Sequence, residues 1–404
     1  MNYEDTELSA LAERLVSARK SVGVTQDAAA AHLGMSRPTF IAIEKAVRRP
    51  RPEEIVKLAA LYRTSVNTLL RQETQPPKLQ PHLRSALNNN NAEDQEELET
   101  AIAKLTGFVD DYVFLEKKLD AQPVNNFPPR IHAQVGPVER FAEHCAQEER
   151  ARLNLGAHLP IYTLRKVLED VGVHVFIDTL SSKLAGLYVF VPDFGYCILI
   201  NKLHPRERRR WTTAHEYGHF LLDRDKPGVD YLRAVQRKPE NERFADAFAA
   251  AFLMPEAGVQ RRFYEEVERK SDFNVGDLCR MASYYAVSLM AMTLRLESLT
   301  LIGRGSWDSI KAEGVAVKEL KREAGVEEQA DADSAETFPD RYKLLAVQAW
   351  TSDKISTGTL AKLLRCSLVE AREIAYRCAE VATDADGVSE RFSVNLTDSL
   401  LAVR

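Results

Sequence analysis

The chain has 404 residues, of which 45% are hydrophobic and 28% are charged, and its formal net charge at pH 7 is −5. This length predicts about two to four globular domains, and the negative balance excludes a protein that binds nucleic acid through its overall charge. Five scattered cysteines without a C-x-x-C pair favour buried thiols over a disulfide framework or a cysteine zinc site. With no apolar run of membrane-spanning length and no signal sequence at the N-terminus, we expect a cytoplasmic protein.

Residues 1–72 predict a compact bundle of short helices. Gly23 ends a first helical pattern, Thr25 caps a second helix over Gln26–Leu33, and Ser36 caps a third that runs to about Lys45. Two capped helices on either side of a tight turn are typical of a helix-turn-helix, whose second helix enters the major groove of DNA. Two more helices are expected over Glu53–Leu61 and Ser65–Leu70.

A basic segment follows this turn. Residues 37–51 carry one acid, Glu44, against five cations: Arg37, Lys45, Arg48, Arg49 and Arg51. A charge run is usually a solvated face, but its position directly after the turn favours a contact with DNA.

The run from Thr25 to Leu70 resembles the XRE, or lambda-repressor-like, family of regulators. The resemblance implies a phosphate contact from Gln26 and base-edge contacts from Arg37, Pro38, Thr39 and Ala42. From the basic segment, we expect Lys45, Arg48 and Arg49 as further DNA contacts. Arg37 alone of the base-facing set can make the bidentate contact to guanine. The chain departs from the family at Ala29, where a larger aliphatic residue is usual, and at Ala46, where a glycine usually ends the recognition helix.

Residues 73–130 are expected to form a linker that contains one long helix. Three prolines and four consecutive asparagines leave residues 73–91 almost nothing to bury. Residues 92–120 show an apolar helical stripe that needs a partner surface: Leu98, Ile102, Leu105, Val109 and Tyr112. The partner is either this chain or the same helix of a second chain. Because repressors of this type commonly bind two half-sites, we expect a homodimer.

Residues 131–300 mix helical and strand patterns. Helices are expected over Val138–Leu153, Ile161–Val171 and Glu240–Met254, and strands over Val173–Ile177, Gly186–Val191 and Tyr196–Ile200, with further helices to about Leu299. The strand Tyr196–Ile200 could bind an extended substrate by edge pairing.

The motif His215-Glu216-Tyr217-Gly218-His219 has the form H-E-x-x-H within an expected helix, Trp211–Leu222. Positions four apart share one helix face, so His215 and His219 can take two corners of a zinc tetrahedron. Glu216 is then placed to remove a proton from a water at the open corner. The alternative is an ordinary amphipathic helix with two exposed histidines.

Such a zinc site needs a third protein ligand. The downstream candidates are Asp223, Asp225, Asp230, Glu240 and Glu242. We favour Glu242, because Asp246 lies on the same helix face and could steady a histidine ring from the second shell. The alternative for Glu242 is a helix-start carboxylate favoured by the helix dipole.

The runs GYCILINKLHPRERRRWTTAHEYGHFLLDR and ERFADAFAAAFLMP resemble the ImmA/IrrE family of zinc metallopeptidases. The resemblance covers roughly residues 131–300 and implies that Glu242, in the pattern E-x-x-A-[ND]-x-F-A, is the third zinc ligand. It also implies that Glu216 is the general base of peptide hydrolysis. Tyr217 replaces the family's usual aliphatic residue at a position expected to face away from the metal. No oxyanion donor is evident; Tyr196, His204 and Tyr231 are candidates, each better explained as structural.

Residues 301–404 are expected to be mainly helical, with a charged, loosely patterned stretch at 304–340 and helical patterns over Tyr342–Val381. Residues 355–367 repeat the template of residues 24–36, which predicts a second helix-turn-helix. Acidic residues follow it and repel phosphate, so we interpret this segment as a packing or partner-binding module.

These patterns predict an α+β, mainly α, protein: a helix-turn-helix bundle, a linker helix, a zincin-like metallopeptidase domain and a C-terminal helical module. We expect a regulator that binds an operator in double-stranded DNA and uses Zn²⁺ to cleave a regulatory protein, in a stress, mobile-element or toxin–antitoxin setting. The alternative is a repressor or antitoxin whose zinc domain senses a signal or binds a partner such as a toxin without hydrolysis. The intact Glu216 favours the first, and the attached DNA-binding module favours the second.

Overall fold

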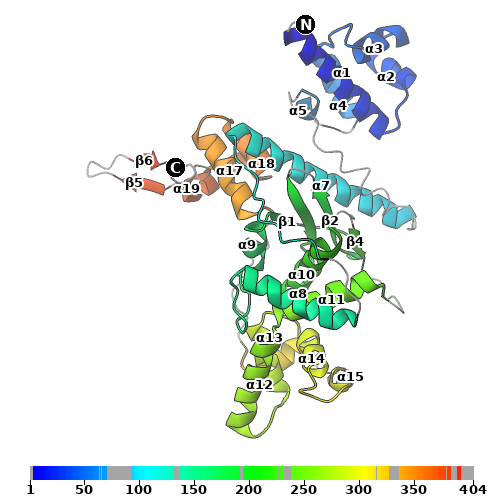
Figure 1. The fold of residues 1–404 in the computed structure, drawn as a ribbon. Coiled ribbons are helices and arrows are strands. Elements are labelled where there is room, and N and C mark those ends of the chain that lie inside the picture. Colours follow the sequence, from blue (N-terminus) through cyan, green and yellow to red (C-terminus); the bar gives the residue numbers. More distant parts are fainter. Residues whose placement is uncertain are drawn as a thin grey trace. The chain divides into compact units, whose positions relative to one another are not determined.

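The computed structural model describes residues 3–62, 64, 66–70, 92–131, 136–191, 194–224, 228–231, 238–314, 316–326, 336–378, 380–383 and 389–392. The chain divides into two compact units, Met1–Pro76 and Pro77–Arg404 (Figure 1). The proline-rich linker predicted over 73–91 and most of the flexible stretch predicted over 327–337 lie outside the described residues.

The first unit is a helical bundle, as the sequence predicted. Its described helices are α1 (Tyr3–Ser21), α2 (Gln26–Leu33), α3 (Arg37–Glu44), α4 (Pro52–Leu61) and α5 (Val66–Leu70). Both predicted caps are present, because the Thr25 hydroxyl accepts from the Ala28 N–H and the Ser36 hydroxyl accepts from the Thr39 N–H. Gly34 ends α2 in the left-handed conformation, with φ 67°. The core between the helices includes Leu15, Phe40 and Leu58.

The two departures from the family pattern have different consequences in this bundle. Ala29 is fully buried in the core, where a larger side chain is usual. Ala46 has φ 57°, so an alanine takes the left-handed conformation that a glycine adopts more easily. The Val47 and Arg48 N–H groups both donate to the Ala42 carbonyl, which closes the end of α3. The turn is therefore kept, at a conformational cost of about 1 kcal/mol.

The second unit is built on a four-stranded sheet of order β1-β3-β2-β4. The strands are β1 (Val173–Asp178), β2 (Leu184–Val191), β3 (Gly195–Asn201) and β4 (Gly228–Tyr231). β3 pairs with β1 in parallel and with β2 in antiparallel orientation, and β2 also pairs with β4. The expectation that Tyr196–Ile200 binds a substrate by edge pairing is therefore wrong, because both edges of β3 are used. On the side away from β3, β2 pairs with β4, which forms that outer edge of the sheet. The sequence pattern did not predict β4.

One face of this sheet carries the helices that form the H-E-x-x-H region. They are α8 (Val138–Arg152), α9 (Leu164–Glu169), α10 (Arg206–Asp223) and α11 (Glu240–Leu253), followed by α12 (Glu256–Lys270), α13 (Val275–Tyr284) and α14 (Leu289–Ser298). Their side chains share one hydrophobic cluster with Val175, Tyr196 and Ile198 of the sheet. α9 is shorter than the predicted helix Ile161–Val171 at both ends. The carbonyl oxygens of Ile161 and Tyr162, which precede it, accept hydrogen bonds from Arg210.

The opposite face of the sheet is covered by α7 (Ala92–Leu119), α17 (Asp340–Thr351), α18 (Thr357–Leu363) and α19 (Leu368–Cys378). All five residues of the predicted α7 stripe are buried there, together with Phe176, Leu187 and Leu199 of the sheet. Neighbouring strand residues such as Val175 and Phe176 point to opposite faces, so one sheet serves both clusters.

The segments 73–130 and 301–404 contribute helices to the core around the sheet of 131–300. α7 and α17–α19 share that core, and the second unit runs from Pro77 to Arg404. The α7 stripe is used within the chain, so it offers no support for a homodimer. The helix predicted to Val381 ends at Cys378, and β5 (Glu380–Thr383) then pairs with β6 (Ser389–Phe392).

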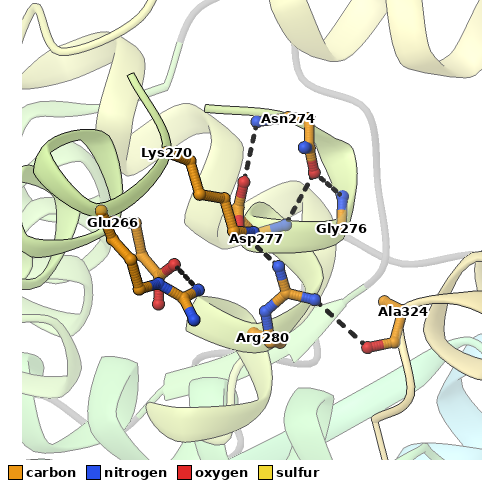
Figure 2. Close-up of polar contacts among 8 residues, drawn as sticks. Glu266, Lys270, Asn274, Gly276, Asp277, Arg280 and Ala324 are labelled. Carbon is orange, nitrogen blue, oxygen red and sulfur yellow. Dashed lines mark hydrogen bonds and ion pairs between the residues drawn. The ribbon is translucent and has the colours of Figure 1, made fainter. Parts of the chain in front are cut away.

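The loosely patterned stretch 304–340 contains two short helices that were not predicted, α15 (Ser306–Ala312) and α16 (Val317–Glu323). A buried carboxylate, Asp277, anchors the neighbouring helices (Figure 2). Asp277 accepts from Lys270 Nζ at 2.6 Å and from Arg280, whose Nη1 also donates to the Ala324 carbonyl at 3.3 Å. Burial raises the pKa of Asp277, but these hydrogen bonds outweigh it and lower the pKa to about 2. Asp277 and Arg280 thus together link the end of α12, the start of α13 and the end of α16.

The cysteine prediction is only partly met. Cys145, Cys197 and Cys279 are buried, whereas Cys378 is exposed at the end of α19. Within the described ranges, no helix combines the length and apolar character that crossing a membrane requires.

Candidate metal centre and DNA-binding surface

Helices α10 and α11 bring two histidines and a glutamate together. The Nε2 atoms of His215 and His219 lie 3.1 Å apart, and the Glu242 carboxylate oxygens lie 3.4 Å from the first and 3.3 Å from the second. A tetrahedral zinc with ligand bonds of about 2.0–2.1 Å has edges of about 3.3 Å between its ligand atoms. The edge between the two histidines is close to this value, and each histidine has a different oxygen of Glu242 at a similar distance, Oε2 for His215 and Oε1 for His219. The three side chains can therefore act as three ligands of such a site. Among the residues that the structure describes, they are the one group of this kind.

The hydrogen bonds around His215 suit a metal ligand. Its Nδ1 lies 3.1 Å from Asp246 Oδ1, and Lys238 Nζ binds the other oxygen of Asp246 at 2.5 Å. A neutral imidazole that donates Nδ1–H to a carboxylate has its lone pair on Nε2, the atom that faces His219 and Glu242. The sequence placed Asp246 in this position but did not indicate Lys238.

The charges in the cluster are strongly coupled. Burial lowers the pKa of His215, but hydrogen bonds to Asp246 and Glu242 outweigh it and raise the pKa to about 10. Hydrogen bonds from His215 and His219 lower the pKa of Glu242 well below its usual range. In the absence of a metal the cluster thus favours a proton on His215, which a divalent cation would replace.

The close approach of α10 and α11 depends on small residues. A Cβ added at Gly218 would lie 3.1 Å from Ala245 Cα and 3.2 Å from a ring atom of Phe248. Ala245 follows Glu242 by one helical turn, so the contact sets how near Glu242 comes to the histidines. A Cβ at position 218 would require its neighbours on α11 to shift by a few tenths of an ångström.

The other residues that the sequence analysis discussed for the metal site lie at different places around it. Glu216 is 0% exposed, one residue beyond His215 on α10. Tyr217 contacts Glu149 of α8 through its hydroxyl, and Arg152 holds that carboxylate at 2.7 Å. Tyr196 donates its hydroxyl to the Glu216 carbonyl at 3.4 Å, which is a structural contact. His204 is half-buried after β3, and its carbonyl accepts from Arg209.

The other candidate ligands do not join the cluster in the described part of the chain. Glu240 is exposed at the start of α11, Asp225 lies outside the described residues, and the side chains of Asp223, Asp230 and Tyr231 lie outside them as well. One neighbour was missed by sequence reasoning: the Tyr188 ring stacks on His219 with centroids 5.4 Å apart. No local motif marks Tyr188, because strand pairing brings it there.

The predicted DNA-binding residues lie in the first unit. Arg37 and Pro38 are exposed at the start of α3, and Lys45 and Arg49 are exposed beyond its end. Arg37 makes a loose pair with Asp27 at 3.5 Å, in which both side chains are more than half exposed. Thr39 and Ala42 are half-buried, and the Thr39 hydroxyl lies 2.8 Å from that of Ser36.

Two residues of this set are engaged within the protein. Gln26 Nε2 donates to Glu44 at 2.7 Å, and Arg19 binds the same carboxylate at 2.6 Å. Arg48 makes a two-pronged contact with Glu54 at 2.7 and 3.0 Å. Arg19 thus neutralises the charge of Glu44 in the interior, whereas Glu54 neutralises the charge of Arg48 at the surface. The exposed cations of this segment are Arg37, Lys45, Arg49 and Arg51.

Comparison with known proteins gives two family matches. Residues 10–71 match a helix-turn-helix domain, and residues 168–297 match the IrrE N-terminal-like domain of Peptidase M78. No curated protein matches the chain. A crystal structure of ComR from Streptococcus suis aligns at 13% identity over 92% of this chain and 94% of that chain, with a TM-score of 0.16 that gives no information on the fold. The chain joins an XRE-like helix-turn-helix domain to an IrrE/ImmA-like domain of the Peptidase M78 family.

Proposed function

We propose that this protein is a DNA-binding regulator that holds zinc between His215, His219 and Glu242 and hydrolyses a peptide bond in a regulatory protein. The observation that carries the proposal is the close approach of the candidate ligand atoms: the two Nε2 atoms lie 3.1 Å apart, and Oε1 and Oε2 of Glu242 lie 3.3 Å from His219 and 3.4 Å from His215. The fully buried Glu216 next to this cluster supplies a base.

The chain's own residues have separate parts in this chemistry. Zinc, when bound, would supply a Lewis acid that polarises water and the scissile carbonyl. Glu216 accepts the proton of the attacking water in a low-dielectric setting and passes it to the leaving amine. Asp246 orients the His215 ring, and the contact of Gly218 with Ala245 keeps Glu242 in reach of both histidines.

The DNA-binding part of the proposal rests on the first unit. Arg37, exposed at the start of α3, reads a guanine in an operator, and Lys45 and Arg49 contact phosphates. Arg48 is removed from the phosphate-binding set because Glu54 already neutralises it. We also propose that the DNA-bound form is a homodimer on two half-sites, in a stress, mobile-element or toxin–antitoxin setting.

A second candidate is a regulator whose zinc site senses a signal or grips a protein without hydrolysis. It is favoured by burial, since His215, Glu216 and His219 are 6%, 0% and 2% exposed. Histidines buried this deeply favour a metal that senses a signal or holds a partner over one that meets a substrate, although the Glu242 side chain is 36% exposed.

Metal analysis and a cleavage assay separate these candidates. We expect about one zinc per chain in the wild type, almost none in His219→Ala, and binding weakened by about 10- to 100-fold in Asp246→Ala. Glu216→Gln keeps the shape of the side chain but loses the base. This variant should still bind zinc, but it should not cleave any of the proteins encoded beside this gene. Glu240→Gln is the matched control, because Glu240 is exposed on α11 outside the cluster.

The outcomes are distinct. A metal-repleted wild type without zinc would refute the zinc site altogether. Zinc binding with equal regulation by wild type and Glu216→Gln in the cell would establish the second candidate. Loss of regulation in Glu216→Gln alone would establish hydrolysis.

A further inference from the structure

The two histidines of the metal centre are held in different ways. The Nδ1 atom of His215 lies 3.1 Å from Asp246 Oδ1, and this hydrogen bond sets the orientation of its ring. The Nδ1 atom of His219 is buried and makes no hydrogen bond within the part of the chain that the structure describes. The orientation of the His219 ring therefore has to come from packing.

The ring of Tyr188 supplies this packing. It lies nearly parallel to the His219 imidazole, with an angle of 14° between the planes and 5.4 Å between the centroids. Tyr188 is 7% exposed on β2, where it pairs with Ile198 of β3 on one side and with Gly228 of β4 on the other. Because neighbouring strands fix its backbone on both sides, Tyr188 offers the imidazole a rigid surface.

A second tyrosine supports Tyr188. Tyr196 of β3 packs on the Tyr188 ring with centroids 5.3 Å apart, and Phe220 of α10 packs on Tyr196 with centroids 4.7 Å apart. His219 and Phe220 are consecutive residues, so this row of four rings begins and ends on α10. The row joins the sheet to the helix and keeps the Tyr188 ring against the imidazole.

The stack also favours the metal-bound form of the imidazole. A ring whose Nε2 binds a divalent cation is poor in electrons, whereas the face of a phenol ring is negative, so metal binding strengthens their attraction. We propose that Tyr188 is a positioning residue for His219. Its ring holds the imidazole so that Nε2 faces His215 and Glu242. The inference rests on the proposed zinc site and deepens it, because it assigns an orienting residue to the second histidine ligand.

Cobalt(II) binding to the full-length protein tests this role, since cobalt takes the same ligands as zinc and its visible absorption reports their geometry. Tyr188→Leu removes the ring, so it should weaken cobalt binding by about three- to tenfold and change the absorption spectrum of the bound metal. Tyr188→Phe keeps the ring and should restore both the wild-type affinity and the wild-type spectrum. Zinc affinities measured by competition with a chelator should follow the same order.

The matched control is Phe190→Leu, which removes an aromatic ring from the same face of β2 two residues further along. Phe190 packs on Phe127, with centroids 6.2 Å apart. Its loss should lower the melting temperature of the metal-free protein but leave the affinity and the spectrum of cobalt unchanged.

The outcomes separate this inference from the proposed function. A wild type that binds neither cobalt nor zinc would refute the zinc site itself. A wild type that binds cobalt, together with a Tyr188→Leu variant of equal affinity and spectrum, would leave the zinc site standing and refute the role of Tyr188. Weak binding by Tyr188→Phe, or a loss in Phe190→Leu as large as that in Tyr188→Leu, would also refute it, because the hydroxyl or the stability of β2 would then account for the effect.

Discussion

Two segments of this protein share one local design and differ in their surroundings. In the first, Thr25 caps α2 and Ser36 caps α3; in the second, Ser356 caps α18, and Ser367 binds the N–H of Glu370 at the start of α19. Both turns contain a residue in the left-handed conformation, which is Gly34 with φ 67° in the first and Arg365 with φ 51° in the second.

The difference lies in what each pair of helices packs against. α2 and α3 belong to a small bundle whose exposed segment carries Arg37, Lys45, Arg49 and Arg51. α18 and α19 are part of the large cluster that α7 and α17 form on the sheet. The comparison teaches that the template specifies a capped turn, whereas the surrounding charge and packing decide whether the second helix is suited to DNA.

The largest expected effects come from truncating each core. Phe40 of α3 and Leu360 of α18 are both fully buried. Phe40→Ala should lower the free energy of unfolding by about 3–5 kcal/mol and Leu360→Ala by about 2–5 kcal/mol, because each leaves a cavity. Calorimetry should show that Phe40→Ala lowers only the transition of the first unit and Leu360→Ala only that of the second. A single shared transition, lowered by both variants, would show that the two segments belong to one cooperative structure.

A smaller effect is expected on DNA binding. Arg37→Ala should weaken binding to the specific operator by about 1–3 kcal/mol and binding to random DNA very little, because base contacts specify. Lys362→Ala removes an exposed cation from α18 and should change neither affinity nor salt dependence. Fluorescence anisotropy at several salt concentrations measures both. The comparison fails if Lys362→Ala reduces the affinity as much as Arg37→Ala does.

The smallest effect concerns the two turns. Gly34→Ala should destabilise the first unit by about 1 kcal/mol, since an alanine is strained at this φ. Arg365 carries the same strain, but its guanidinium lies 3.8 Å from the centre of the Phe108 ring. Arg365→Gly loses this contact and relieves the strain, whereas Arg365→Ala only loses the contact, so glycine should be the more stable of the two by about 1 kcal/mol. Equal unfolding free energies for the two variants would mean that the turn is unstrained.

Much of the candidate site was predictable because its signals are local. The spacing of His215 and His219 places both rings on one helix face, and Glu242 and Asp246 share a face of the next long helix. The structure brings these four side chains together. Tyr188 and Lys238 escaped prediction, because strand pairing places the first and an ion pair with Asp246 places the second.

The fold was predictable to a similar degree. Caps and breaks gave the helices of the first unit, and apolar runs gave β1, β2 and β3. The four-residue strand β4 was missed because it is short, and the central position of β3 was missed because alternation within a strand does not reveal its neighbours.

By itself, the sequence determined the capped helices, the two helix-turn-helix templates and the H-E-x-x-H motif, because each depends on residues within a few positions of one another. Only the tertiary structure decided that α7 is buried within the chain, that Glu54 neutralises Arg48, and that α10 and α11 meet closely enough at Gly218 for Glu242 to reach both histidines. These features depend on contacts between residues distant in sequence, and an amphipathic stripe or a charge specifies the kind of partner it needs without specifying where that partner lies.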